Sequence, residues 1–185
     1  MVKETAQPHA RDVDARLIDA ALRGREQAFD SLVGPLIEPA FGLAYTLLRQ
    51  PEEAEDAVQE ACFKAWRKLR QLKDGRSIRP WFMSIVANQC RSARRARWWS
   101  TLRVPEVPER PADVEHAVVR RLDLARGFAR LSAEDRLAVH LFFYLDLPLP
   151  EIALVMGLSQ AAARARLYRA VKRLRPDVEP REVLP

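Results

Sequence analysis

The chain has 185 residues, of which 48% are hydrophobic and 30% charged, and its formal net charge at pH 7 is +6. A chain of this length can bury one core or two small ones, and its positive charge favours a polyanionic partner. The two cysteines, Cys62 and Cys90, are too few for a disulfide framework and lack metal-ligand spacing, so we expect no metal and no cofactor. The sequence shows no signal peptide and no apolar run of membrane-spanning length, so we expect a cytoplasmic protein.

The first part of the chain shows helical hydrophobic periodicity. We expect a frayed tail over residues 1–11, then a helix from Asp14 that stops at Gly24. A second helical stretch follows over residues 29–36, and Pro39 is expected to end or kink it before the pattern resumes over residues 41–48. Because no segment alternates as a strand would, the sequence predicts an all-α fold.

The next predicted helix begins at Pro51 and has one apolar and one acidic side. Residues 52–60 hold five acids and no base. The packing stripe consists of Val58, Cys62, Ala65, Trp66 and Leu69, and the opposite side carries Asp56, Gln59, Glu60 and Phe63. An aromatic ring on that polar side is expected to pack against either another helix of the same domain or a partner protein. The helical spacing of the residues does not distinguish these two interpretations. A metal or acid/base pair of Asp56 and Glu60 would lack a third ligand.

A loop at residues 73–77, KDGRS, leads into a basic helix rich in tryptophan over residues 78–99. Its predicted packing stripe is Phe82, Ile85, Val86, Gln89, Ala93 and Ala96. The opposite side carries Asn88, Arg91, Arg94 and Arg95, with Trp98 among the arginines. Cations bind phosphates, an amide can recognise a base edge, and flat rings stack on bases, so this side favours nucleic-acid binding. The alternative is a solvated basic helix end whose tryptophans simply pack.

The same loop has a predicted role beside that helix. Lys73 and Arg76 in the loop lie close in sequence to Arg79 at the start of the helix. A basic loop beside Asn88 could close over a base extruded from its stack, at a cost of a few kcal/mol for unstacking.

The middle of the chain predicts a linker. Residues 101–113 contain Pro105, Pro108 and Pro111 and no apolar periodicity, which is typical of a semi-rigid extended segment. A helix is expected over residues 114–129.

The last part of the chain predicts a helix-turn-helix. Ser132 and Asp135 form a capping box ahead of a helix over residues 137–145. A short helix over residues 151–156 follows two prolines, Gly157 makes the turn, and Ser159 caps a final helix that runs to about residue 173. Two helices joined by a tight glycine turn are the helix-turn-helix arrangement.

The final helix has a basic outer strip. Residues 159–175 hold six basic residues and no acid. The side chains predicted to pack inward are Ala163, Leu167, Ala170 and Leu174, and those predicted to point outward are Arg164, Ala165, Tyr168, Arg169 and Lys172. Arginine and lysine there can neutralise phosphates or reach guanine in the major groove, and tyrosine can contact a phosphate or a thymine methyl. A basic C-terminal helix of an unrelated small bundle is the alternative.

Three segments together resemble an extracytoplasmic-function sigma factor, the promoter-specificity subunit of bacterial RNA polymerase. They are AFDSLV with AEDAVQEACFKAW, RPWFMSIVANQCRSARR, and EIALVMGLSQAAARARLYRAVKRL. The resemblance implies two small helical domains joined by a Pro-rich linker: residues 12–99 for polymerase binding and minus-ten recognition, 100–113 for the linker, and 114–176 for a helix-turn-helix that recognises the minus-thirty-five element.

The resemblance also implies roles for individual residues. Asp56, Gln59 and Glu60 fall on the family's polymerase-binding face, and Phe63 thereby gains a partner. The loop residues Lys73, Arg76, Ser77 and Ile78, together with Asn88, fall where the family recognises a flipped minus-ten base, with Arg91, Arg94 and Arg95 along the same helix. Arg164, Tyr168 and Arg169 fall where the family contacts the minus-thirty-five element, with Ala165 and Lys172 on the same strip.

The match has two departures. Members usually have Gly-Thr-Val, a basic residue and Ser where this chain has Ala161, Ala162, Ala163, Arg164 and Ala165. The missing hydroxyls remove two hydrogen bonds and weaken or change specificity for the upstream element. Ser92 also replaces a frequent aspartate.

The expected function is therefore promoter-specific transcription initiation together with core polymerase, without catalysis by this chain. The implied partners are the clamp helices of the large polymerase subunit, promoter DNA and, in some members, an anti-sigma factor, with no membrane insertion. The competing hypothesis is a stand-alone helix-turn-helix regulator that binds its operator without polymerase. A recombinase or nuclease would need a nucleophile near the basic face, where Ser92 is the one candidate and lacks neighbouring acids.

Overall fold

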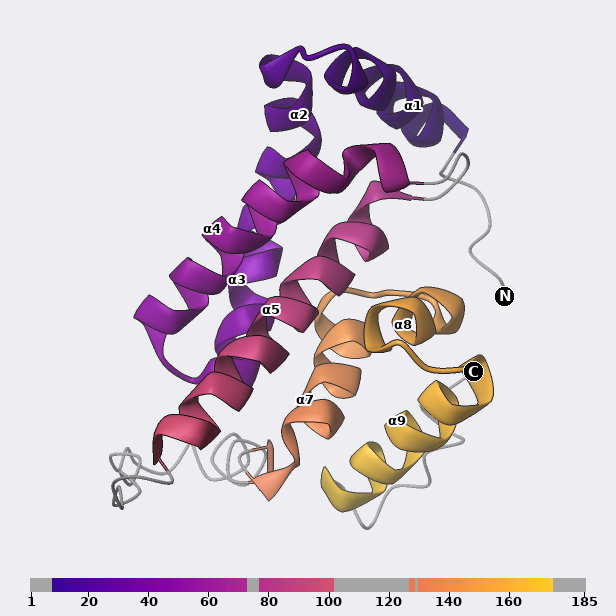
Figure 1. Cartoon of the computed structure of the whole chain (residues 1–185). Helices are drawn as coiled ribbons and strands as arrows, with labels where there is room; N and C mark the ends of the chain where they lie inside the picture. The colour runs from indigo at the N-terminus through magenta and orange to yellow at the C-terminus, as the bar shows by residue number, and fades with distance from the viewer. Residues whose placement is uncertain (1–7, 73–76, 102–126, 129, 175–185) are drawn as a thin grey trace, which may run out of the picture. The chain divides into compact units, whose positions relative to one another are not determined.

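The computed structural model describes residues 8–72, 77–101, 127–128 and 130–174 (Figure 1). Every regular element among these residues is helical, as the sequence predicts. The chain divides into two compact units, residues 1–90 and 91–185, and the division falls within a helix. The predicted linker over residues 100–113 begins too early, because residues 100 and 101 still belong to the helix that ends at Thr101. Its remaining residues and the predicted helix over residues 114–129 lie outside the described residues, apart from the helical residues 127–128.

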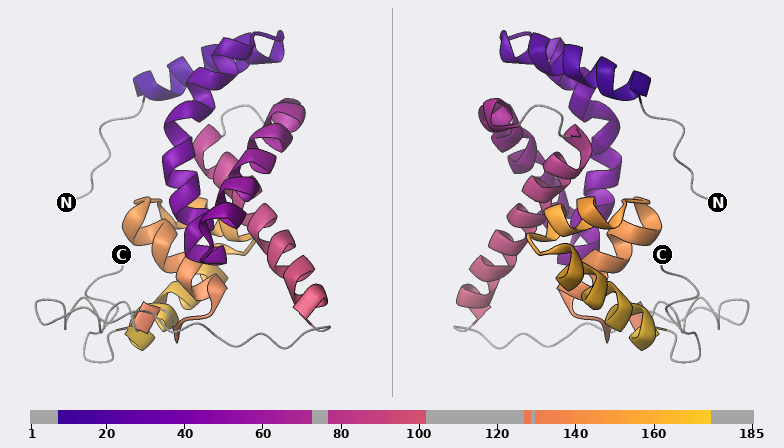
Figure 2. Two further views of the ribbon diagram at one scale, coloured as in Figure 1. Left: turned by 90° about the vertical axis from the view of Figure 1, so that its left-hand side faces the viewer. Right: turned by 90° about the vertical axis from the view of Figure 1, so that its right-hand side faces the viewer.

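The first unit begins with a helical corner. Helix α1 (Pro8–Leu22) packs against α2 (Glu26–Val33) and lies across its N-terminal end (Figure 2). Gly24 between them has a φ of +87°, a conformation that glycine adopts without strain. Helix α1 includes residues 8–11, so the predicted frayed tail does not extend that far; residues 1–7 lie outside the description.

The break predicted at Pro39 occurs earlier in the chain. Helix α2 ends at Val33, a 3₁₀ turn η1 (Gly34–Leu36) follows, and α3 (Ile37–Leu48) begins at once. Pro39 lies in the first turn of α3, where its missing N–H is not needed for a hydrogen bond within the helix, so it neither ends nor kinks a helix. Pro35, inside the 3₁₀ turn, stands at the break.

The continuous stretch Glu26–Leu48 has a mean hydropathy of 1.3 in its most apolar window and is long enough to cross a membrane on length and composition alone. On length and composition this stretch departs from the expectation that the chain has no apolar run of membrane-spanning length. Many of its apolar side chains, such as Phe29, Leu43 and Leu47, are buried in the first unit. The stretch therefore supplies core residues of this unit.

Helix α4 (Pro51–Lys68), with its 3₁₀ extension η2 (Leu69–Gln71), packs against α3 and buries several small side chains. Ala54, Ala61 and Ala65 are completely buried. Trp66 packs edge to face on Phe29 of α2, with ring centroids 5.1 Å apart. Burial raises the pKa of the Cys62 thiol.

Helix α5 (Ile78–Thr101) brings Phe82, the largest fully buried side chain of the described residues, to the core of the first unit. Phe82, Met83, Val86, Ala87 and Cys90 are all fully buried. The predicted stripe is correct for Phe82 and Val86 but wrong for Ala96, which is exposed, and it omits Met83, Ala87 and Cys90. The buried arc is thus rotated toward these three residues, because packing depends on which side of the helix meets the rest of the unit.

The second unit contains α7 (Ala133–Val139), its π-helical continuation η3 (His140–Tyr144), α8 (Leu149–Met156) and α9 (Gln160–Leu174). Both predicted serine caps are present: Ser132 Oγ accepts from the Asp135 N–H at 3.1 Å, and Ser159 Oγ accepts from the Ala162 N–H at 3.2 Å. The predicted capping box is only half formed, because the Asp135 carboxylate pairs with Arg173 and Arg166 instead of bonding back to Ser132. Gly157 ends α8 with a φ of +67°. The helix-turn-helix is therefore present as predicted, with α8 beginning two residues earlier than expected.

A buried carboxylate ties α7 to α9. Asp135 is 6% exposed, and one of its oxygens accepts from Arg173 Nη1 at 2.7 Å. Its other oxygen lies 3.6 Å from Arg166 Nη1. The apolar core of the same unit includes the fully buried Leu137, Leu141, Ile152 and Leu167.

Candidate functional surfaces

The outer side of α4 is an acidic and aromatic surface, here called the α4 surface and defined by Asp56, Gln59, Glu60 and Phe63. All four side chains are exposed, and Phe63 is 57% exposed. The Arg67 guanidinium lies 5.5 Å from the Phe63 ring centroid, a cation–π distance. An aromatic side chain left this open beside carboxylates is suited to a partner that offers both apolar surface and positive charge.

Lys64 connects the α4 surface to α5. Its Nζ lies 3.2 Å from Glu60 Oε1, one turn earlier on α4, and donates to Gln89 Oε1 at 3.0 Å. The spacing of four residues from Glu60 signals the ion pair in the sequence. Nothing local signals the bond to Gln89, which is 25 residues away, and Lys64 is absent from the predicted site.

Asn88 is exposed on α5, next to Gln89 in the sequence. The turns before it are held firmly: Pro80 and Phe82 are buried, and Ser84 Oγ donates to the Trp81 carbonyl oxygen at 2.6 Å. Asn88 is thus an exposed residue on a helix whose opposite side is embedded in the core. A side-chain amide can both donate to and accept from one base edge.

The predicted loop residues are only partly described. Ser77 is half-buried, and Ile78, the first residue of α5, is 3% exposed. The Ile78 side chain therefore packs inside the protein. Lys73 and Arg76 lie outside the described residues.

The C-terminal turns of α5 carry an exposed basic stretch. Arg94, Arg95 and Arg97 are exposed, and Trp98 is 65% exposed, which is unusual for so large an apolar ring. Arg95 Nη2 donates to Ser92 Oγ at 3.0 Å. Arg91 is half-buried, and its Nε and Nη2 each donate to an oxygen of Glu134 at 3.0 Å, which holds the pKa of that carboxyl below its usual range.

Helix α9 presents the predicted basic strip, here called the α9 surface. Arg164, Ala165, Arg169 and Lys172 are exposed and Tyr168 is half-buried. Ala163, Leu167, Ala170 and Val171 on the other side are buried. The helix is amphipathic as predicted, with guanidinium and ammonium groups along the solvent side, except that Val171 is buried and Leu174, which is predicted to pack inward, is half-buried.

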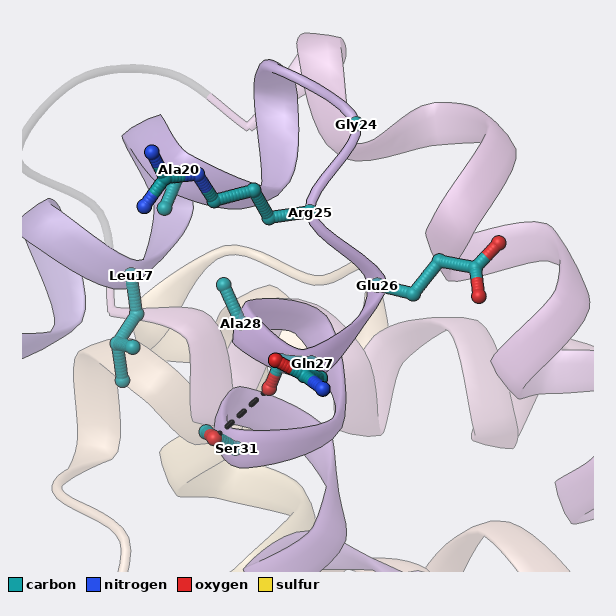
Figure 3. Close-up of a pocket in the computed structure, with 8 residues that line it drawn as sticks. All are labelled: Leu17, Ala20, Gly24, Arg25, Glu26, Gln27, Ala28 and Ser31. Carbon is teal, nitrogen blue, oxygen red and sulfur yellow. Dashed lines mark hydrogen bonds between the residues drawn. The ribbon is translucent and has the colours of Figure 1, made fainter.

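A hollow of about 570 Å³ lies at the corner between α1 and α2 (Figure 3). Its lining is separate from the three surfaces above and consists of Leu17, Ala20, Gly24, Arg25, Glu26, Gln27, Ala28 and Ser31. Ser31 Oγ donates there to the Gln27 carbonyl oxygen at 2.8 Å. Within the described parts of the chain, no group of three or more His, Cys, Asp or Glu side chains is placed to hold a metal ion.

Two family models match the chain. The model for Sigma-70 region 2 matches residues 32–100, and that for Sigma-70, region 4 matches residues 121–174. Together they include the α4 surface, Asn88 and the α9 surface.

The chain is also similar to individual proteins. It is 30% identical to the ECF RNA polymerase sigma factor SigM of Mycobacterium tuberculosis over 87% of its own length and 82% of that protein. Among solved structures, CnrH in complex with the cytosolic domain of CnrY matches 89% of this chain and 96% of that one, with a TM-score of 0.66 and 26% identity. The sigma factor RpoE in complex with the anti-sigma factor NepR from Bartonella quintana matches 80% and 94%, with a TM-score of 0.66 and 24% identity, and shares the fold.

Proposed function

This chain belongs to the extracytoplasmic-function sigma factors of RNA polymerase, and from that membership we propose that its α4 surface binds the core enzyme. The observation that carries the proposal is the exposure of Phe63 beside Asp56 and Glu60. A partner that covers the ring and pairs with the carboxylates removes apolar area from water and gains charge-assisted contacts. Residues 12–99 form the domain proposed to carry this activity.

The second part of the proposal concerns the minus-ten element. Asn88 supplies the amide for one base edge, and the exposed Arg94 and Arg95 supply attraction to phosphates that does not depend on sequence. Lys73, Arg76 and Ser77 belong to the proposed base-binding loop. The buried side chain of Ile78 is left out of the contacts, because it anchors the start of α5.

The third part concerns the minus-thirty-five element. The α9 surface follows the tight turn at Gly157, which is how a recognition helix reaches the major groove. Arg164, Arg169 and Lys172 contact phosphates or guanine, and Tyr168 contacts a phosphate or a thymine methyl. Residues 114–176 are proposed to form this domain, and the residues that follow α5, 102–113, to join it to the first.

The protein acts by binding alone. Phosphodiester bond formation belongs to the polymerase, so the chain directs initiation in the cytoplasm without catalysing a reaction. Because CnrH and RpoE were solved in complexes, the second with an anti-sigma factor, we include a protein of that class among the proposed partners.

The test is a double charge reversal on the α4 surface. The variant Asp56→Arg/Glu60→Arg is expected to lose co-purification with core polymerase while keeping its helical circular dichroism, because both side chains are exposed. A matched control is Glu26→Arg/Asp30→Arg on α2, which changes the net charge equally at exposed positions outside this surface. Retention of core polymerase by the first variant would contradict the assignment.

A further inference from the structure

Lys64 holds two groups that belong to different proposed activities. The Lys64 ammonium has three N–H donors. Its Nζ forms an ion pair with Glu60 Oε1 at 3.2 Å and donates a hydrogen bond to Gln89 Oε1 at 3.0 Å. Glu60 belongs to the α4 surface, and Gln89 follows Asn88 directly on α5. The same side chain therefore lies between the polymerase-binding carboxylate and the helix that presents the base-binding amide.

The surroundings make this connection sensitive to binding. The side chains of Lys64 and Glu60 are 39% and 51% exposed, so water competes with the ion pair and the pair contributes little to stability. The Lys64–Gln89 bond is partly buried. A cationic group of a partner that approaches Glu60 competes directly with Lys64 for the carboxylate.

We propose that Lys64 is a positioning residue that couples polymerase binding at Glu60 to base recognition by Asn88. In the free chain the ammonium is shared between Glu60 and Gln89. When polymerase takes over Glu60, the lysine bonds to Gln89 alone, and this change in the side-chain contacts beside Asn88 orients the Asn88 amide. The inference rests on the proposed function of the α4 surface and of Asn88.

This coupling has a thermodynamic consequence. If core polymerase improves binding of minus-ten DNA through Lys64, then that DNA improves binding of core polymerase by the same factor. A lysine shared at a half-exposed site supports a factor of roughly two to five, since exposed ion pairs contribute up to about that range. The effect should be confined to the base that Asn88 contacts, because Lys64 acts on α5 next to that residue.

The experiment uses the full chain, core RNA polymerase and a fork-junction DNA whose minus-ten strand is unpaired. The affinity for core is measured with and without the DNA, and discrimination is measured with single-base variants of the minus-ten strand. Lys64→Met removes the charge and keeps the aliphatic stem. Lys68→Met, an exposed lysine one turn further along α4, is the matched control, and Gln89→Met removes the acceptor.

Support for the proposal requires three results. Lys64→Met reduces the coupling factor and the discrimination at a single base by roughly two- to fivefold, Lys68→Met changes neither, and Lys64→Met has no further effect in the Gln89→Met background. An unchanged coupling factor in Lys64→Met, or an equal loss in Lys68→Met, overturns it. If Lys64→Met fails to fold, Gln89→Met tests the same hydrogen bond from the acceptor side, and an unchanged coupling factor there overturns the proposal equally. A wild-type chain that does not bind core would instead refute the proposed function itself.

Discussion

Removing the buried carboxylate of Asp135 should loosen the helix-turn-helix unit. Asp135 is 6% exposed, and its two oxygens lie 2.7 Å from Arg173 and 3.6 Å from Arg166. Breaking a fully buried pair costs about 3–5 kcal/mol, chiefly because a charge is left without compensation. Here the arginine side chains are 61% and 30% exposed, so water resolvates them in the variant and reduces the cost. We therefore expect Asp135→Ala to destabilise α7 and α9 by about 1–3 kcal/mol.

Hydrogen exchange measured peptide by peptide provides the assay, because it separates the second unit from the first. Amides of Ala133–Val139 and Gln160–Leu174 should exchange roughly 5- to 150-fold faster in Asp135→Ala, with no change in α3 or α4. The control is Asp146→Asn: Asp146 is exposed with a φ of +49°, and asparagine tolerates that left-handed conformation. Unchanged protection of α9 would refute the view that Asp135 joins α7 to α9.

Three further predictions concern single side chains. Asn88→Ala should reduce discrimination at one minus-ten base by about 1–3 kcal/mol, measured by run-off transcription from promoter variants; an equal loss on every variant would indicate a structural role instead. Trp98→Ala should weaken holoenzyme binding to fork-junction DNA by about 1–3 kcal/mol and leave the salt dependence of the binding constant unchanged. Arg95→Gln should instead reduce the slope of log binding constant against log salt concentration by about 0.9. A changed slope in Trp98→Ala would contradict a stacking role. Burial lowers the pKa of His140 to about 4, so between about pH 4 and 6.5 the folded state binds fewer protons than the unfolded state. The neutral, buried imidazole therefore stabilises the folded state fully above this pH range. That stabilisation is lost as the pH falls through the range. Urea unfolding of the second unit should accordingly show a loss of about 2 kcal/mol from pH 6.5 to 5 that His140→Leu abolishes, and an equal loss in that variant would assign the effect to other groups.

Local signals in the sequence were sufficient for the helix ends of the second unit. Ser132, Gly157 and Ser159 act within three residues of themselves, through a cap or a left-handed turn, so their effect does not depend on the rest of the fold. The outward side of α4 was predictable for a related reason. Its polar and apolar residues separate cleanly at helical spacing, and the exposed positions of Asp56, Gln59, Glu60 and Phe63 follow from it.

Contacts between distant residues could not be predicted in the same way. The partners Lys64 and Gln89, and Asp135 and Arg173, are 25 and 38 residues apart, and each bond exists because apolar packing elsewhere brings two helices together. Helix α5 shows the same limit. The predicted stripe took one side of the helix from its apolar spacing, and the burial of Met83, Ala87 and Cys90 shows that the buried arc extends further round the helix than that spacing indicates.

The arrangement of the first unit also determines how clearly its surfaces can be tested. Helix α4 packs against α3 and buries the small side chains of Ala54, Ala61 and Ala65, while α5 buries the larger side chains of Phe82 and Met83. The residues proposed to bind polymerase and DNA contribute almost nothing to this core. Substitutions at those positions therefore change binding free energy without a matching change in the free energy of unfolding. A variant of the α4 surface that lost both would show that the surface packs against the protein itself, and the polymerase assignment would then lose its physical basis.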